Sequence, residues 1–419
     1  MALAVGVFAL ALAAIASERI HRTKVALVGA GLMVVTQTID QEEAIAAIDF
    51  NTIGLLAGMM LMVRLTETTG AYTWLAIRAG QLSRGRPLAV TASLAVTTAV
   101  LSAFLDNLTT VLLIVPITFL LADALDVDPI PLVIIEIIAS NIGGTATLIG
   151  DPPNIIIAGA TGLSFGSFIA NLAPIAALAF AVVTGVLYVR FRGRLRIPAE
   201  ARARVMQLDA AASIEDHEEL LRTVPILVLT ILVFFFHNAL DLQPATVALA
   251  GATVMLLVSR QSLEGALAGI EWPTLFFFLG LFVMVGALEE TGAIGEVADG
   301  VAELTGGDRT AEILGITWVS ALGSGLVDNI PFTATMIPVV EQLQSGQGGG
   351  DDAYWWALSL GACFGGNATL IAAAANVAAA GMAARAGRPI GFVEFLKVGL
   401  PATVLSLVLA TAYISIRYL

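Results

Sequence analysis

Carboxylate, amide and hydroxyl side chains interrupt two apolar segments at matching places. The two clusters are Asp106, Asn107 and Thr109 in the first segment, and Asp328, Asn329 and Thr333 in the second. Such oxygens are ligands that suit a hard cation such as Na⁺, and each carboxylate can also carry a proton. Because a charge in hydrocarbon is costly, these residues must face one another or an aqueous cavity. We therefore predict an ion site with Na⁺ or H⁺ as the coupling ion, no other cofactor, and Asp106, Asn107, Asp328 and Asn329 as candidate Na⁺ ligands.

Two further polar clusters contain the residues that break helices. Their candidate site residues are Asn141, Gly143, Gly144, Thr145, Thr147, Asp151 and Asn154 in the first, and Asn367, Thr369 and Asn376 in the second. Paired glycines let a helix unwind, and Pro152-Pro153 removes two amide donors. A broken helix offers carbonyl oxygens to cations and a helix N-terminus to anions. For Asp151 two interpretations stay open, a site carboxylate or a cap of the helix after the prolines.

The clusters recur because the chain repeats itself at an offset of 222 residues. Asp106-Asn107 aligns with Asp328-Asn329, and the seven residues from Gly143 match those from Gly365 at six positions. A lone Asp-Asn pair could cap a helix and a lone Gly-Gly could serve helix packing. Both elements occurring twice at one spacing favour a site built by two copies of one unit, which is typical of secondary transporters.

Composition places the chain in a membrane. Apolar residues are 58% of the sequence and charged residues 13%, with a mean hydropathy of +0.90. Soluble domains have about 45–50% apolar and about 25% charged residues. The net charge of −13 argues against a nucleic-acid partner. No GxxxxGK[ST] loop for ATP occurs, so we expect any pumping by this chain to be driven by ion gradients.

The distribution of charge predicts the topology, because Lys and Arg concentrate on the cytoplasmic side. Basic residues gather in the segments 19–24, 78–86 and 190–204, and acidic ones in 40–49 and 289–312. This pattern predicts an N-terminus outside the plasma membrane and five crossings in the first copy. An odd number inverts the second copy. The predicted division is a first inverted repeat at 1–189, a cytoplasmic linker at 190–223 and a second inverted repeat at 224–419.

The predicted fold is therefore an all-α polytopic membrane protein. Each inverted repeat has about five spanning helices, a re-entrant hairpin with its tip at 106–107 or 328–329, and an unwound helix. In the linker we expect the acidic residues to face water: Glu215, Asp216, Glu218 and Glu219. Glu136 lies in an apolar run, where it is a coupling carboxylate or an interfacial residue near a helix start, and we expect the latter.

Four segments resemble the signatures of the arsenite permease and melanosomal P protein family: LSAFLDNLTTVLLIVPIT, NIGGTATLIGDPPN, GLVDNIPFTATMIPVV and GACFGGNATLIAAAANV. That family belongs to the ion transporter superfamily, with sodium/proton antiporters and sodium–dicarboxylate carriers as relatives. The resemblance implies a homodimer in which a transport part slides across the membrane as an elevator. It also implies that two hairpin tips and two unwound helices meet at one site.

The chain departs from its implied relatives at two places. The dicarboxylate carriers show Ser-Asn-Thr at the hairpin tips, whereas this chain has Asp in place of Ser at both Asp106 and Asp328. This difference favours proton or sodium exchange over dicarboxylate transport. The GDPPN element is reduced to AAAAN at 372–376, so we expect the two cation sites not to be equivalent.

These observations predict a secondary active transporter rather than an enzyme. The predicted partners are the lipid bilayer, a second copy of the chain, and a small ion or oxyanion-like solute such as arsenite, coupled to H⁺ or Na⁺. The alternatives are a Na⁺/H⁺ antiporter, and an anion channel or sodium-coupled carboxylate carrier. An intramembrane aspartyl protease is disfavoured because Asp151 follows Leu148-Ile149-Gly150 rather than Gly-x-Gly. On the sequence alone, Asp106→Asn is expected to abolish coupling.

Overall fold

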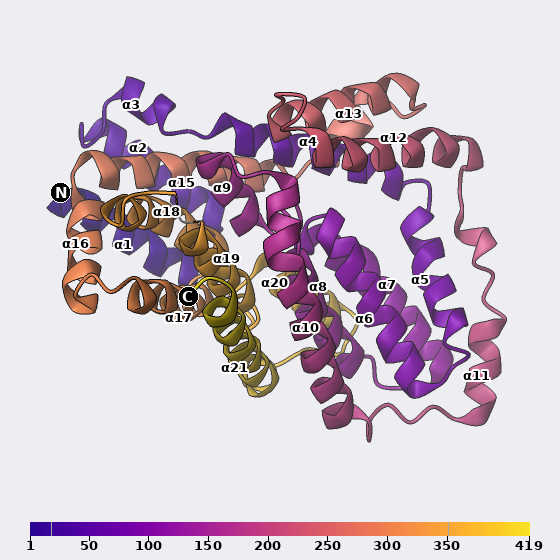
Figure 1. The fold of residues 1–419 in the computed structure, drawn as a ribbon. Helices are drawn as coiled ribbons and strands as arrows, with labels where there is room; N and C mark the ends of the chain where they lie inside the picture. Colours follow the sequence, from indigo (N-terminus) through magenta and orange to yellow (C-terminus); the bar gives the residue numbers. More distant parts are fainter. Residues whose placement is uncertain (18, 351) are drawn as a thin grey trace.

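A computed structural model describes residues 1–17, 19–350 and 352–419, and every regular element in these ranges is helical (Figure 1). The helices up to residue 191 are α1 (Ala2–Ala16), α2 (Arg22–Val35), α3 (Gln41–Ala46), α4 (Phe50–Glu67), α5 (Ala71–Leu82), α6 (Pro87–Phe104), α7 (Asn107–Leu125), α8 (Ile130–Gly144), α9 (Pro152–Thr161) and α10 (Phe165–Phe191). The all-α class predicted from the sequence is thereby confirmed.

A short helical segment and a second series of helices complete the chain. They are α11 (Ala199–Met206), the 3₁₀ turn η1 (Ala211–Ser213), α12 (His217–Phe236), α13 (Pro244–Val258), α14 (Leu263–Ala268), α15 (Trp272–Glu290), α16 (Ala293–Thr305), α17 (Arg309–Leu326), α18 (Asn329–Gly346), α19 (Ala353–Gly365), α20 (Ala374–Arg385) and α21 (Phe392–Arg417). The helix starts repeat at the offset found in the sequence. The pairs that begin 222 residues apart are α2 and α13, α3 and α14, α4 and α15, α5 and α16, α6 and α17, α7 and α18, and α9 and α20.

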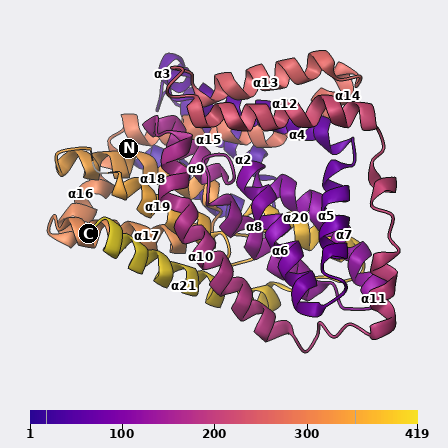
Figure 2. The ribbon, with the colours of Figure 1, turned by 45° about the vertical axis from the view of Figure 1, so that its right-hand side comes forward.

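The helices pack in two ways. In one group, α2 packs on α15 and α4 on α13, so that the early and late parts of the chain interleave. In the other group, each helical hairpin packs on the broken helix that follows it, α6 and α7 on α8 and α17 and α18 on α19. Figures 1 and 2 show α12 and α13 lying together beside α4, away from α6 and α7. The polar clusters all lie in the second group.

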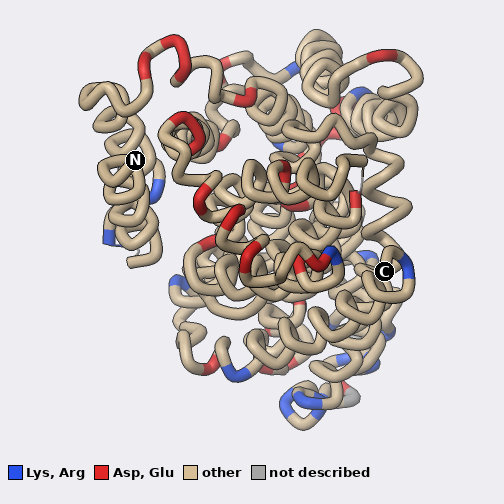
Figure 3. Tube along the Cα trace, turned by 60° about the vertical axis from the view of Figure 1, so that its left-hand side comes forward, with Lys and Arg blue, Asp and Glu red and all other residues tan. Residues whose placement is uncertain are grey.

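Six helices among the described residues are long and apolar enough to cross a membrane: α6, α7, α10, α12, α15 and α21. The shorter apolar helices are α1, α8 and α13. Figure 3 shows the helices uncharged along most of their length. Lys and Arg gather at the lower end, where Figure 1 places the chain between α10 and α11. The number of crossings and the inverted orientation of the second copy remain predictions.

Local chemistry sets the hairpins and the breaks. Asp106 caps α7 by accepting a hydrogen bond from the Thr109 amide at 2.8 Å, which turns the chain directly after α6. The first break runs from Thr145 to Asp151, between the paired glycines and the paired prolines. The predicted hairpin tips and the interruption after Gly143-Gly144 therefore lie where the sequence placed them.

Two expectations about carboxylates were wrong. Glu219 does not face water, because α12 already begins at His217 and directs this residue toward the end of α13, where its carboxylate accepts from Ser259 and from the Arg260 amide at 3.1 Å. Glu136 is not interfacial. It lies in the middle of α8 and is buried against α7.

Glycine permits close packing where the hairpins meet the broken helices. A Cβ on Gly143 would lie 2.5 Å from Ala99 Cα, and one on Gly365 would lie 2.6 Å from Ala321 O. Gly143→Ala is therefore expected to lower the free energy of unfolding by about 1–3 kcal/mol through overpacking. The check is thermal unfolding in detergent. Gly185→Ala is the control, because no atom lies within 4 Å of its added Cβ. Equal stability of the two variants would contradict this packing.

Candidate ion-binding centre

Both hairpin tips converge on one carboxylate oxygen. Asn107 Nδ2, at the start of α7, and Asn329 Nδ2, at the start of α18, donate to Asp151 Oδ1 at 3.1 and 3.0 Å. Asp151 is completely buried, and its Oδ2 has no partner among the described residues. Although Asp151 directly precedes α9, its side chain makes no capping hydrogen bond. Of the two interpretations of Asp151, the geometry matches the site carboxylate.

A network of amides surrounds this carboxylate and joins the two copies. Asn141 Oδ1, on α8, accepts from Asn107 Nδ2 at 3.1 Å. Asn141 Nδ2 donates to the Oδ1 atoms of Asn367 and Asn376, both at 3.0 Å. Asn367 Nδ2 is buried and has no partner among the described residues. Among the described residues, the fully buried polar atoms of the centre that have no partner are therefore an acceptor, Asp151 Oδ2, and a donor, Asn367 Nδ2.

Two asparagines hold the unwound stretches in shape. Asn154 Nδ2 donates to the carbonyls of Thr145 and Thr147 at 3.1 and 2.8 Å. Asn376 Nδ2 donates to those of Gly366 and Thr369 at 2.7 and 2.9 Å. These hydrogen bonds fix the backbone of the two unwound stretches, so Asn154 and Asn376 position the residues of the centre.

Of the five threonines that the sequence proposed as ligands, four donate to the backbone and Thr109 donates to Asp106. The hydroxyls of Thr147 and Thr369 bond to carbonyls in the first arms of the hairpins, at Ala103 and Gly325. Thr145 donates to the Asn141 carbonyl at 2.8 Å, and Thr333 to the Asn329 carbonyl at 2.7 Å. Gly143 and Gly144 have no side chains to offer and pack against Ala99 and Gly150. These residues support the backbone around the centre.

The two hairpin aspartates cap helices rather than meet at the centre. Asp106 Oδ2 accepts from the Thr109 hydroxyl at 2.5 Å, in addition to the amide bond at Oδ1. Asp328 Oδ1 accepts from the Ile330 amide at 2.9 Å. Among the described residues no three His, Cys, Asp or Glu side chains gather as they would around a metal ion. Of the four candidate Na⁺ ligands, the two asparagines reach the central carboxylate.

Arg22 was missed by the sequence interpretation, which used it only to assign topology. Its Nη1 forms an ion pair with Asp328 Oδ2 at 3.1 Å, and its guanidinium lies 5.2 Å from the centre of the Phe277 ring. Its counterpart in the second copy is Pro244, so the repeat gives no signal for it. A cavity of about 20 Å³ lies here, lined by Arg22, Asp106, Asn107, Glu271 and Asn329 among others. Since a water needs about 10–15 Å³, this cavity has room for one small species.

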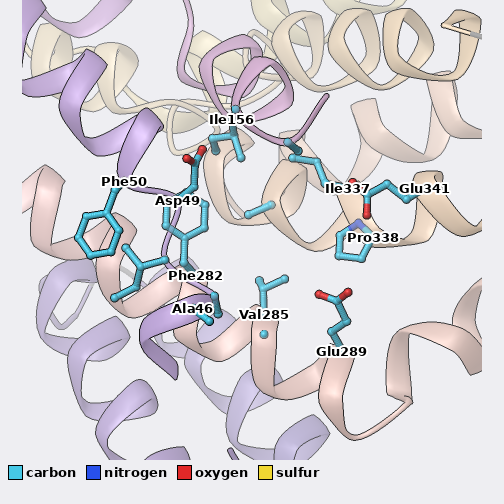
Figure 4. Close-up of a pocket in the computed structure, with 16 residues that line it drawn as sticks. Ala46, Asp49, Phe50, Ile156, Phe282, Val285, Glu289, Ile337, Pro338 and Glu341 are labelled. Carbon is cyan, nitrogen blue, oxygen red and sulfur yellow. The ribbon is translucent and has the colours of Figure 1, made fainter. Parts of the chain in front are cut away.

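Two larger cavities are lined in part by the helices that follow the breaks, α9 and α20. One, of about 560 Å³, is lined by the acidic Asp49, Glu289 and Glu341 and by apolar residues that include Ile156 of α9 (Figure 4). The other, of about 390 Å³, is lined by Arg22, Asp328 and residues of α20. One cavity is therefore acidic, and the other contains an arginine paired with the start of α18.

The centre has two chemically different sides, because the paired helices α9 and α20 begin differently. Helix α9 follows the Asp151 carboxylate and begins with Pro152 and Pro153, which have no amide hydrogen. Helix α20 follows Ala373 and begins with Ala374 and Ala375, which keep theirs. A carboxylate favours a cation, whereas a helix N-terminus with free amides favours an anion.

Long apolar helices, helical hairpins and broken helices around a buried polar centre define a membrane transporter. A family model described as "CitMHS: Citrate transporter" matches residues 12–361, and the chain belongs to this family. It is 43% identical over 421 residues to an uncharacterized transporter of Mycobacterium tuberculosis, covering 99% of this chain and 98% of the relative.

Two further comparisons extend this result. The P protein of Homo sapiens is 33% identical over 501 residues, which cover 100% of this chain and 59% of that protein, so the predicted resemblance to the P protein family is confirmed. The crystal structure of the YdaH transporter of Alcanivorax borkumensis matches with a TM-score of 0.60 and 16% identity. The match covers 92% of this chain and 88% of that one, and at this identity it supports the fold alone.

Proposed function

We propose that this chain is a secondary active transporter that binds its coupling ion, H⁺ or Na⁺, at Asp151. The observation that carries the proposal is the convergence of Asn107 and Asn329 on one oxygen of this buried carboxylate while the other oxygen has no partner. Amide donors orient the carboxylate but leave its charge uncompensated. A bound proton or Na⁺ supplies that compensation.

The same charge gives a physical reason for coupling. An unpaired carboxylate in the low-dielectric interior of a membrane protein is costly, and binding a cation or proton neutralises it. Arg22, the cation nearest the hairpin tips, is already paired with Asp328. The ion-loaded centre therefore moves through the membrane more easily than the empty one. We propose that it moves as part of an elevator, in a homodimer of the plasma membrane.

For the solute we propose a small ion or oxyanion-like species, with arsenite as the first probe. Supporting features are the amides that open α20 and the arginine in the cavity beside them. The family's description as citrate transporters makes a carboxylate the second probe. The alternative of a Na⁺/H⁺ antiporter is favoured by one observation, that the charged group at the heart of the centre is a carboxylate.

The test is flux into proteoliposomes of purified protein under imposed pH and Na⁺ gradients, with arsenite or citrate supplied separately. We expect accumulation of one solute against its gradient, driven by one of the two ions. Proton movement triggered by Na⁺ without any solute would instead identify an antiporter. Solute current that only follows its own gradient would indicate a channel and contradict the proposal.

A further inference from the structure

Glu136 is a buried carboxyl group outside the ion centre. It is the seventh residue of α8, 1% exposed, and its Oε1 accepts a hydrogen bond from Thr118 of α7 at 2.5 Å. Its Oε2 has no partner among the described residues. One neutral hydroxyl is a weak substitute for the hydration of an ionised carboxylate, so the neutral acid is the form that suits this position.

The charged groups on the surrounding helices do not compensate for the cost of burying an ionised Glu136. Helix α6, which packs on α8 most extensively, contains no ionisable residue. On α7, Asp123 is exposed near the end of the helix, and on α10 the ionisable residues Tyr188 and Arg190 stand in the last turns. The ionisable residues of α19, α20 and α21, which touch α8 more lightly, are Tyr354, Cys363, Arg385, Glu394, Lys397, Tyr413 and Arg417. Among the described residues, no ion pair involves Glu136.

Glu136 belongs to a set of buried polar residues on the packed helices α7 and α8, which we call the polar seam: Thr110, Thr118, Glu136 and Ser140. The two threonines are eight residues apart and share one face of α7, and the two residues of α8 are four apart and share another. Thr110 Oγ1 has no partner among the described residues.

The polar seam leads to the ion centre. Ser140 Oγ lies 3.2 Å from the Asn107 carbonyl and 3.1 Å from Ser102 Oγ. The side chain of Asn107 in turn donates to Asp151. Glu136 is five residues before Asn141 on the same helix and six after the start of α8. It therefore lies between the N-terminal end of α8 and the centre.

The second copy shows that packing alone does not require this polarity. The residues 222 positions after the four seam residues are all apolar: Phe332, Val340, Leu358 and Ala362. The second copy does bury a glutamate elsewhere, Glu312, but that carboxylate has hydroxyl and amide partners in Tyr354, Thr305 and Gln347. Glu136 has one partner, which distinguishes it from a carboxylate that serves structure.

We propose that Glu136 is a second proton-binding site, joined to the ion centre by the polar seam. The ligand is H⁺, held on the carboxyl group of Glu136 in this conformation. Its part in coupling rests on the proposed transport function, but proton binding by Glu136 does not. The first copy thus contains a buried acid at a place where the second copy has Leu358.

The test is infrared spectroscopy of the full-length protein in lipid across a pH titration, for wild type, Glu136→Gln and Asp151→Asn. We expect a protonated-carboxyl band that Glu136→Gln removes and Asp151→Asn retains. Thr118→Val should shift the frequency of this band, because it deletes the hydrogen bond to the acid. A Glu136→Gln spectrum that keeps every protonated-carboxyl band of the wild type would overturn the proposal.

A second measurement tests whether Glu136 takes part in proton movement and controls for folding. The double variant Thr118→Val with Glu136→Leu copies the second copy's Val340 and Leu358, so we expect it to remain folded while losing the band. In proteoliposomes with a pH-sensitive dye, Glu136→Gln should lose proton movement driven by a membrane potential. Proton movement equal to that of the wild type would overturn a part for Glu136 in proton movement. The infrared spectrum is measured without transport, so its result does not depend on whether the proposed function is correct.

Discussion

Asp151→Asn is expected to abolish ion-coupled transport and leave the protein folded. Asparagine keeps the size of the side chain and one oxygen that can accept from Asn107 and Asn329, but it carries neither charge nor proton. Because the variant centre has no charge to neutralise, it can move without a bound ion, and movement is then no longer coupled to ion binding. The measurement is solute accumulation in proteoliposomes under the driving gradient, with thermal unfolding as the check on folding.

The matched control for this variant is Asp106→Asn. Asp106 caps α7 through Thr109, and asparagine caps a helix about as well as aspartate. We therefore expect Asp106→Asn to retain coupling, contrary to what the sequence alone predicted. If Asp106→Asn lost coupling while Asp151→Asn kept it, the assignment of the central carboxylate would be wrong.

The second large effect is expected from Arg22→Gln. The substitution leaves the Asp328 carboxylate, whose side chain is 8% exposed, without its cationic partner. Breaking a fully buried pair typically costs about 3–5 kcal/mol, and the side chain of Arg22 is 21% exposed, so we expect a loss of about 2 kcal/mol in this conformation. Unfolding in denaturant measures the loss.

A double-mutant cycle separates the ion pair from other effects of Arg22. Asp328→Asn in the Arg22→Gln background removes the unpaired charge, and asparagine can still accept from the Ile330 amide. The double variant should therefore recover much of the lost stability. If the loss of stability in the double variant equalled the sum of the losses in Arg22→Gln and Asp328→Asn, the ion pair would contribute little.

The helical hairpins and the breaks were predictable because their causes are local. Paired glycines, paired prolines and a capping aspartate act within a few residues, and the duplication repeats the glycines and the aspartate in the second copy. The prediction that Asp106-Asn107 forms a hairpin tip matches the start of α7 at Asn107. Patterns of this kind need no knowledge of distant contacts.

The roles of individual carboxylates depended on distant contacts and could not be predicted in the same way. Asp151 meets Asn329, which is 178 residues away, and Arg22 meets Asp328 at a separation of 306. Neither Asp151 nor Arg22 has a counterpart of its own kind in the second copy, so the repeat gave no support for either. The repeat highlighted the hairpin-tip asparagines and the residues that shape the breaks, whereas the charged groups Asp151 and Arg22 each occur in one copy alone.

Direct measurement of ion binding tests the central claim, that one coupling ion binds at Asp151. Purified wild type, Asp151→Asn and Asp106→Asn are each titrated with radioactive Na⁺ and, separately, with acid. The first titration measures bound sodium and the second measures protons taken up. The account predicts a binding event that Asp151→Asn deletes and Asp106→Asn keeps. Unchanged ion binding by Asp151→Asn would contradict it.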